Sequence, residues 1–321
     1  MARQLLSICM LGMCFAAPLA QSQEAINFGI ISTESSQNLR QDWQPILDDM
    51  SKKLGVKVNA FFAPDYAGVI EGMRFNKIQV AWLGNKSAIE AVDRASGEVF
   101  AQMVNADGSL GYYSMISVQK DSAYKTLDDV LKNAKNMNFG IGDPNSTSGY
   151  LVPSYYVFAQ NNVNPKTAFK TVRSANHETN IMAVANKQVD AAVHSSDTLE
   201  RVEARQPEIA HQLRQVWKSP LIAADPLVWR KDLTPDLKMK MKAFFVDYGR
   251  IGANAATEKL ALKKLTLGGF QDSSNAQLKP VRQLELFKER IKVEGDTTLS
   301  TDDRKLKLDD LTRKLADVAK S

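Results

Sequence analysis

Cysteine and histidine are scarce in this chain of 321 residues, which contains two cysteines and three histidines. Both cysteines, Cys9 and Cys14, lie near the N-terminus, so the sequence beyond them has no residues for a disulfide or a thiolate metal site. There is no Gly-Lys pair before a Ser or Thr, and no Gly-x-Ser-x-Gly elbow. These absences argue against a phosphate-binding loop of nucleotide hydrolases and against an α/β-hydrolase.

Acidic side chains are missing from the first 22 residues. One basic residue, Arg3, precedes an almost unbroken apolar run from Leu5 to Phe15, which is the layout of a secretory signal peptide. The run is shorter than the roughly 20 apolar residues that a membrane-spanning helix needs. We expect residues 1–22 to be a signal peptide and the remainder to be an exported protein.

Positive charge is present only in modest excess, with a formal net charge of +5. Basic residues are mixed with acidic ones along the sequence and form no stripe interleaved with aromatics, so nucleic-acid binding is unsupported. A mature chain of about 300 residues is long enough for one large domain or two lobes.

Apolar runs and helical periodicities alternate along the chain. A strand is expected at Ile26–Ile31, followed by a helix that ends at Gly55 and by a helix at Ala67–Phe75. Further strands are expected at Val56–Phe62, Ile78–Leu83, Val99–Val104, Met115–Val118, Asn138–Ile141 and Val189–Val193. This alternation is typical of an α/β fold with parallel sheets.

Hydroxyl residues are concentrated in the stretch Gly142–Tyr150, between two apolar runs. An Asp-Pro pair ends the preceding strand, and Ser146, Thr147 and Ser148 fall where a helix begins. The first N–H groups of a helix lack internal partners and carry partial positive charge. The stretch therefore predicts a seat for a tetrahedral oxyanion, with simple helix capping as the alternative.

Histidine 177 and two acids are further candidates. His177 opens like a zinc-protease helix, but Ile181 stands where the second metal ligand belongs, so we expect no metal site. It could instead donate to an anion or lie exposed at a helix start. Asp225 is the one charged residue within Leu221–Trp229, either a turn residue or a group held for a cation. Asp197 follows a strand, where ligand sites of α/β sheets tend to lie.

Two tyrosines stand at expected turns, Tyr66 after Pro-Asp and Tyr112 after Gly111. Each could contact a ligand or pack in the core.

The C-terminal residues 291–321 differ from the rest and predict a helical tail. One face of a charged helix carries Leu308, Leu311, Leu315 and Val318. This stripe is too narrow for an isolated helix. The helix must dock on its own chain, which we favour, or on a second subunit in a homodimer.

Several stretches in order from residue 26 onward resemble the periplasmic phosphonate-binding protein of phosphonate ABC importers. They are Asn27–Ser35, Phe61–Gly68, Gly72–Lys77, Gly142–Gly149, His177–Asn180, Ala183–Asp190 and Trp217–Ile222. The resemblance implies a two-lobed α/β periplasmic substrate-binding protein, type II-like. Each lobe would have a mostly parallel sheet flanked by helices, and the ligand would lie in the interlobe cleft. Residues 23–116 and 218–290 would form the first lobe and residues 117–217 the second.

The resemblance also implies roles for single residues. Phosphonate oxygens would be held by Tyr66, Ser146, Thr147, Ser148 and His177, with His177 adding charge if protonated. The ammonium of an aminoalkylphosphonate such as 2-aminoethylphosphonate would be surrounded by Tyr112, Asp197 and Asp225.

The sequence departs from the family pattern at two of its positions. Asp197 stands where the family has Glu, and Leu83 replaces an aromatic that could shape the cleft wall. The shorter Asp197 side chain could reach an amine through water, which leaves the preferred phosphonate open.

The implied function is transport rather than catalysis: no cofactor, no metal, and a membrane permease as partner. A binding protein for inorganic phosphate, phosphite or sulfate is the main alternative. A secreted phosphoester hydrolase is the other, although the sequence provides no convincing nucleophile or metal site for it.

Overall fold

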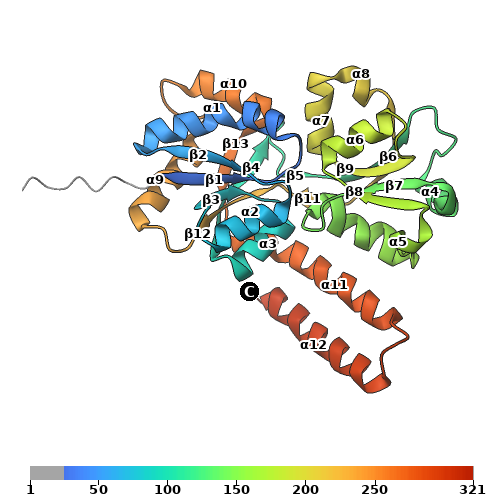
Figure 1. The fold of residues 1–321 in the computed structure, drawn as a ribbon. Coiled ribbons are helices and arrows are strands. Elements are labelled where there is room, and N and C mark those ends of the chain that lie inside the picture. The colour runs from blue at the N-terminus through green and yellow to red at the C-terminus, as the bar shows by residue number, and fades with distance from the viewer. Residues whose placement is uncertain (1–24, 321) are drawn as a thin grey trace, which may run out of the picture.

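We describe residues 25–320 in a computed structural model; the expected signal peptide lies outside the described residues. Figure 1 shows two α/β lobes side by side, with a pair of helices extending away from both. None of the helices in this part of the chain is long and apolar enough to cross a membrane.

The first lobe is built on a sheet with the strand order β13-β4-β12-β3-β1-β2. Its strands are β1 (Ile26–Ile30), β2 (Val58–Phe62), β3 (Val80–Trp82), β4 (Gly97–Asn105), β12 (Pro226–Arg230) and β13 (Leu267–Asp272). Its helices are α1 (Ser36–Leu54), α2 (Tyr66–Arg74), α3 (Asn85–Arg94), α9 (Pro235–Asp247) and α10 (Ala255–Lys264).

The second lobe is built on a sheet with the strand order β10-β6-β9-β7-β8. Its strands are β6 (Ser114–Gln119), β7 (Asn138–Ile141), β8 (Thr171–Ser174), β9 (Ala191–Ser195) and β10 (Leu213–Lys218). Its helices are α4 (Leu127–Lys132), α5 (Pro165–Ala168), α6 (His177–Ala185), α7 (Ser196–Arg205) and α8 (Pro207–Ala210). Short helical segments are η1 (Ala134–Asn136), η2 (Thr147–Leu151), η3 (Ser154–Phe158) and η4 (Ala159–Asn161).

Both sheets are mixed, so the expectation of mostly parallel pairing is wrong: three of the five pairings in the first sheet and two of the four in the second are antiparallel. Strands β2, β1 and β3 pair in parallel, as do β9, β7 and β8. By contrast, β12 and β6 run antiparallel to both of their neighbours. The reason is the route of the chain: β6 and β12 each enter their sheet directly from the other lobe, without the crossover helix that parallel strands require.

The chain passes between the lobes twice, and the two passages pair with each other. Strand β5 (Gly111–Tyr112) is antiparallel to β11 (Ile222–Ala223), with Tyr112 opposite Ile222. The expected lobe boundary between residues 116 and 117 falls inside β6. This two-stranded connection brings Tyr112 to the junction of the lobes.

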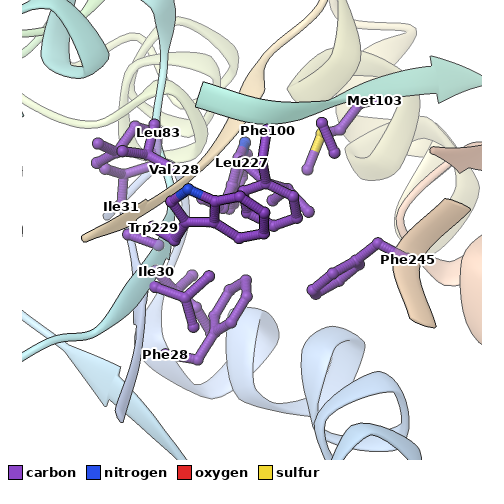
Figure 2. Close-up of a cluster of buried hydrophobic side chains, with 14 of the residues drawn as sticks. Phe28, Ile30, Ile31, Leu83, Phe100, Met103, Leu227, Val228, Trp229 and Phe245 are labelled. Carbon is purple, nitrogen blue, oxygen red and sulfur yellow. The ribbon is translucent and has the colours of Figure 1, made fainter. Parts of the chain in front are cut away.

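Aromatic side chains fill the core of the first lobe (Figure 2). The rings of Phe100 and Trp229 stack with centroids 4.1 Å apart, and Phe245 packs against Phe100. Trp43 lies 5.1 Å from Phe28 and 5.4 Å from Trp82, measured between ring centroids. Because such interiors are close-packed, Trp82 is held firmly at the end of β3.

The tail forms a helical hairpin with the helix before it. After η5 (Asn275–Leu278), α11 (Lys279–Gly295) packs along α12 (Thr301–Lys320) (Figure 1). Ser300 caps α12 by accepting a hydrogen bond of 3.1 Å from the Asp303 N–H. Leu311 is buried, and Leu308, Leu315 and Val318 are partly buried, as the stripe predicted. Docking within the chain is therefore confirmed, and the homodimer gains no support.

Candidate ligand-binding site

One cavity between the lobes is lined by every residue that the sequence analysis singled out for ligand contact. These are Tyr66, Tyr112, Ser146, Thr147, Ser148, His177, Asp197 and Asp225. The cavity contains about 290 Å³ of empty space, including the solvent at its mouth. Only about 20 Å³ of this space can take the centre of a water-sized sphere, which is close to what one water molecule needs, so the cleft is nearly closed on its lining side chains.

The cavity lies where helices begin after the strands of both sheets. Helices α2, α3, η2, α6 and α7 begin at Tyr66, Asn85, Thr147, His177 and Ser196. Ligands of open α/β sheets bind at the carboxyl ends of strands, where such helix starts converge. The positive ends of their helix dipoles make the cavity favourable for an anion.

Ser146 serves as a cap and also lines the cavity, so its role as a cap is compatible with the predicted contact to an anion. Its Oγ accepts a hydrogen bond of 2.9 Å from Gly149 N and lies 3.4 Å from His177 Nε2. The loop closes tightly, because a Cβ on Gly142 would lie 2.5 Å from the Cα of Gly149. Both glycines are needed for this approach.

The neighbouring hydroxyl residues tie this loop to its surroundings. Thr147 Oγ1 accepts a hydrogen bond of 2.9 Å from the backbone N–H of Lys86, in the other lobe. The carbonyl oxygen of Ser148 accepts one of 2.6 Å from Ser114 Oγ. Tyr66 N donates to Asp143 Oδ2 at 3.2 Å, again across the lobes. Because the contacts of Thr147 and Tyr66 join the two lobes, the cleft is closed in this structure.

His177 is buried at the start of α6 and has one ring nitrogen free for a ligand. Its Nδ1 is buried and meets no hydrogen-bond partner within the described part of the chain. Burial, assisted by nearby His194 and Arg201, lowers the pKa of His177 to about 3. The imidazole of His177 is therefore neutral in the empty cavity, so the condition under which it would add charge is not met there.

The two acids lie close enough to influence each other. Trp82 Nε1 donates to Asp225 Oδ2 at 3.0 Å, whereas Asp225 Oδ1 is buried without a partner among residues 25–320. Burial, together with the charge of Asp197, raises the pKa of Asp225 to about 7. Burial also raises the pKa of Asp197 to about 6. A cation placed beside both carboxylates would relieve these penalties.

Glycine 84 separates the hydroxyl seat from Asp225. An ideal Cβ at this position would lie 3.2 Å from Thr147 Oγ1 and 3.8 Å from Asp225 Oδ1. Thr147 Oγ1 and Asp225 Oδ1 thus both lie within 4 Å of this one position, so the hydroxyl stretch and the acid are neighbours in the cavity. A ligand with an anionic and a cationic end can contact both.

The two tyrosines are protonated and can each donate a hydrogen bond. Burial, reinforced by the charge of Asp225, raises the pKa of both Tyr66 and Tyr112 above the usual range. Each therefore offers a phenolic hydroxyl to the cavity, Tyr66 from the first lobe and Tyr112 from the connection between lobes.

Other lining residues were missed by the sequence analysis, among them Trp82 and Arg201. Arg201 lies four residues after Asp197 on α7, a spacing that puts both on one helix face and could have pointed to it. Leu83, expected to shape the cleft wall, is instead fully buried in the core of the first lobe. The neighbour that does line the cavity is Trp82.

Comparison with known proteins places this geometry in context. Residues 28–278 match the profile of a family described as "ABC transporter, phosphonate, periplasmic substrate-binding protein". The chain is 53% identical over 298 residues to the phosphonates-binding periplasmic protein of Escherichia coli (strain K12), covering 93% of this chain and 87% of that protein.

Two crystal structures resemble the chain in fold. The binding protein component of an ABC phosphonate transporter from Pseudomonas aeruginosa has a TM-score of 0.89 and 54% identity, covering 93% of this chain and 97% of that one. PhnD1 from Prochlorococcus marinus (MIT 9301), in complex with methylphosphonate, has a TM-score of 0.73, covering 82% of this chain and 98% of that one. At 22% identity, this second likeness concerns the fold alone.

Proposed function

Because the chain belongs to the periplasmic phosphonate-binding proteins of ABC transporters, we propose that its own ligand is an aminoalkylphosphonate, 2-aminoethylphosphonate or a close relative. Residues 1–22 would direct the protein to the periplasm, where it would capture the ligand and deliver it to the membrane permease. The related proteins are binding components of transporters, and no covalent step is required.

The unpaired Asp225 Oδ1 is the observation that carries the amine assignment. It is a buried carboxylate oxygen beside the cavity, with no hydrogen bond of ordinary geometry from residues 25–320, although the Tyr112 hydroxyl lies near enough to the carboxylate to lower its pKa. An ammonium would donate to it and would also stabilise Asp197, whose charge raises the pKa of Asp225. Tyr112, buried beside both acids, would complete this end of the site.

The phosphonate end would be held mainly by uncharged donors. Tyr66, Ser146, Thr147, Ser148 and the free ring nitrogen of His177 line this side. The hydroxyl of Ser146 would serve this side through His177: by donating its one proton to His177 Nε2, it leaves the Nδ1–H of His177 to point to a ligand oxygen. The helix starts nearby would add positive potential.

Ligand binding and closure of the cleft would support each other. The cavity takes lining residues from both lobes, so a ligand makes its full set of contacts only in the closed form. The closed form is then the one that the ligand favours, and the form that would be presented to the permease.

Calorimetry with a ligand panel tests the assignment. Purified protein without residues 1–22 should bind 2-aminoethylphosphonate with micromolar affinity or better, and more tightly than ethylphosphonate, which lacks the amine. Phosphate, phosphite and sulfate should bind more weakly still. Tighter binding of phosphate or phosphite than of 2-aminoethylphosphonate would refute the amine assignment and favour the inorganic-anion alternative.

Asp197→Ala tests the role of the acids more directly. The substitution should weaken the binding of 2-aminoethylphosphonate far more than the binding of methylphosphonate, because only the former carries an ammonium. Equal losses for the two ligands would show that Asp197 does not sense the amine.

A further inference from the structure

A charged cluster connects the two lobes beside the cavity. None of its residues is among the proposed ligand contacts. Glu34, in the turn after β1, is 1% exposed and pairs with Arg201 and Arg205 of α7 in the other lobe. Arg205 Nη1 also lies 2.9 Å from Asp42 Oδ2 on α1. Burial alone would raise the pKa of Glu34, but the two guanidiniums hold that pKa below its usual value. Glu34 is therefore ionised in the closed cleft.

A second contact extends the cluster along the same edge. Glu178, in the first turn of α6, accepts hydrogen bonds of 2.7 Å from Ser35 N and 2.6 Å from the side-chain amide of Asn38. Its backbone N–H donates to the carbonyl oxygen of Thr33 at 3.3 Å. Because Ser35 caps α1, a residue of the second lobe completes the start of a helix in the first.

We propose that Glu34, Asp42, Glu178, Arg201 and Arg205 form an interlobe latch that sets how often the cleft closes without ligand. Glu34 and Arg205 are then positioning residues: they determine ligand affinity through the open–closed equilibrium, without touching the ligand. The link to affinity rests on the proposed function, whereas the effect on closure does not.

The arrangement suits adjustment of an equilibrium better than permanent locking. Opening the cleft separates the charges but returns them to water, so Coulomb attraction and desolvation largely offset each other. Arg201 lines the cavity and also pairs with Glu34, so ligand and latch share one wall. A modest bias toward the closed form raises apparent affinity by increasing the competent fraction.

Distances between the lobes in ligand-free protein test the latch directly. Both natural cysteines, Cys9 and Cys14, lie in residues 1–22, so protein lacking that segment can be spin-labelled at cysteines introduced in place of exposed Lys132 on α4 and Lys263 on α10. Arg205→Gln should shift the distance distribution toward the open form, and added salt should do the same in the parent protein.

Lys242→Gln is the matched control. It removes an ion pair of 2.6 Å with Asp272 that lies wholly within the first lobe, and it should leave the interlobe distances unchanged. Glu178→Gln provides a second latch variant and should also open the cleft. Unfolding curves should show that all variants are folded.

Ligand binding gives the second readout. Arg205→Gln should weaken the binding of 2-aminoethylphosphonate about tenfold, mainly through faster dissociation. It should weaken the binding of methylphosphonate by the same factor. A purely structural role would lower the unfolding temperature and leave the distances unchanged. Folded Arg205→Gln and Glu178→Gln proteins with parental distances would overturn the latch. Failure of the proposed ligand to bind would leave the distance test intact, so the two hypotheses fail separately.

Discussion

Asp225→Asn should make the ligand-free protein more stable at alkaline pH while removing its preference for an amine. Asp225 is held in a poorly solvated position with Oδ1 unpaired in the described chain and with Asp197 close by. Ionisation of this carboxyl is therefore less favourable in the folded protein than in the unfolded chain. Removing the charge should stabilise the fold and remove the partner of the ammonium.

The magnitude follows from the raised pKa of Asp225, about 7 in place of 3.8. The penalty is absent below pH 3.8, grows as the pH rises to about 7 and is constant above it, because the unfolded chain loses its proton first. At about 1.36 kcal/mol per pKa unit it reaches at most about 4 kcal/mol at pH 8, and less than half of that at pH 5.

The asparagine introduces an opposing contribution. Its amide oxygen can still accept the Trp82 Nε1 hydrogen bond, which is 3.0 Å long in the parent protein. Its amide N–H₂ group would replace Oδ1 as an unpaired buried group, at a cost of about 1–2 kcal/mol. The net gain in unfolding free energy should therefore be about 2 kcal/mol at pH 8 and close to zero at pH 5.

Urea denaturation at both pH values measures this gain in unfolding free energy, and calorimetry measures the ligand affinities. Asp236→Asn is the control, because its exposed carboxylate pairs with Lys240 on the surface of α9 and should have little effect. An Asp225→Asn protein less stable than its parent at pH 8 would refute the reasoning, as would a gain that does not change with pH.

Three further predictions concern the same cavity. Affinity for 2-aminoethylphosphonate should fall as the pH drops from 8 through 6, because Asp225 and Asp197, with pKa values of about 7 and 6, take up protons; calorimetric curves for methylphosphonate that fall in parallel would contradict this. Ser146→Ala should lower stability by about 1 kcal/mol through loss of the cap and should weaken every anion alike, whereas unchanged affinity in calorimetry would leave Ser146 a cap alone. Gly84→Ala should weaken the binding of phosphonates about tenfold with little change in unfolding temperature, because the alanine Cβ would lie 3.2 Å from Thr147 Oγ1. Unchanged affinity would show that the ligand does not use this space.

Local sequence signals predicted the helix cap at Ser146 well because capping is a local interaction. Ser146 and the Gly149 N–H that it caps are three residues apart. The apolar run before them forms β7 at the position expected from the sequence. The meeting of Tyr66, His177 and Asp225 in one cavity is different. These residues are far apart in sequence, so periodicity says nothing about their proximity, and that expectation came from the family resemblance.

Properties that depend on burial between lobes were beyond the sequence. The neutral state of His177 follows from desolvation in the closed cleft, which a single histidine in a sequence does not reveal. The pairing of Glu34 with Arg201 joins residues from different lobes, and each looks like an ordinary surface charge in its own helix or turn. The antiparallel course of β6 and β12 likewise depends on the path between lobes rather than on local residue pattern.

The proposed two-ended ligand would match two features of the empty cavity at once. Its hydroxyl side offers helix starts and neutral donors, while burial on the other side raises the pKa values of Asp197 and Asp225, an effect that the guanidinium of Arg201 offsets only in part. A simple oxyanion would contact the first side only and would leave the raised pKa values of the two acids, which Arg201 offsets only in part. A zwitterionic phosphonate would contact both sides. On the proposed function, discrimination among anions would therefore belong to the acidic side of the cavity, and the proposed latch would set how strongly every ligand is held.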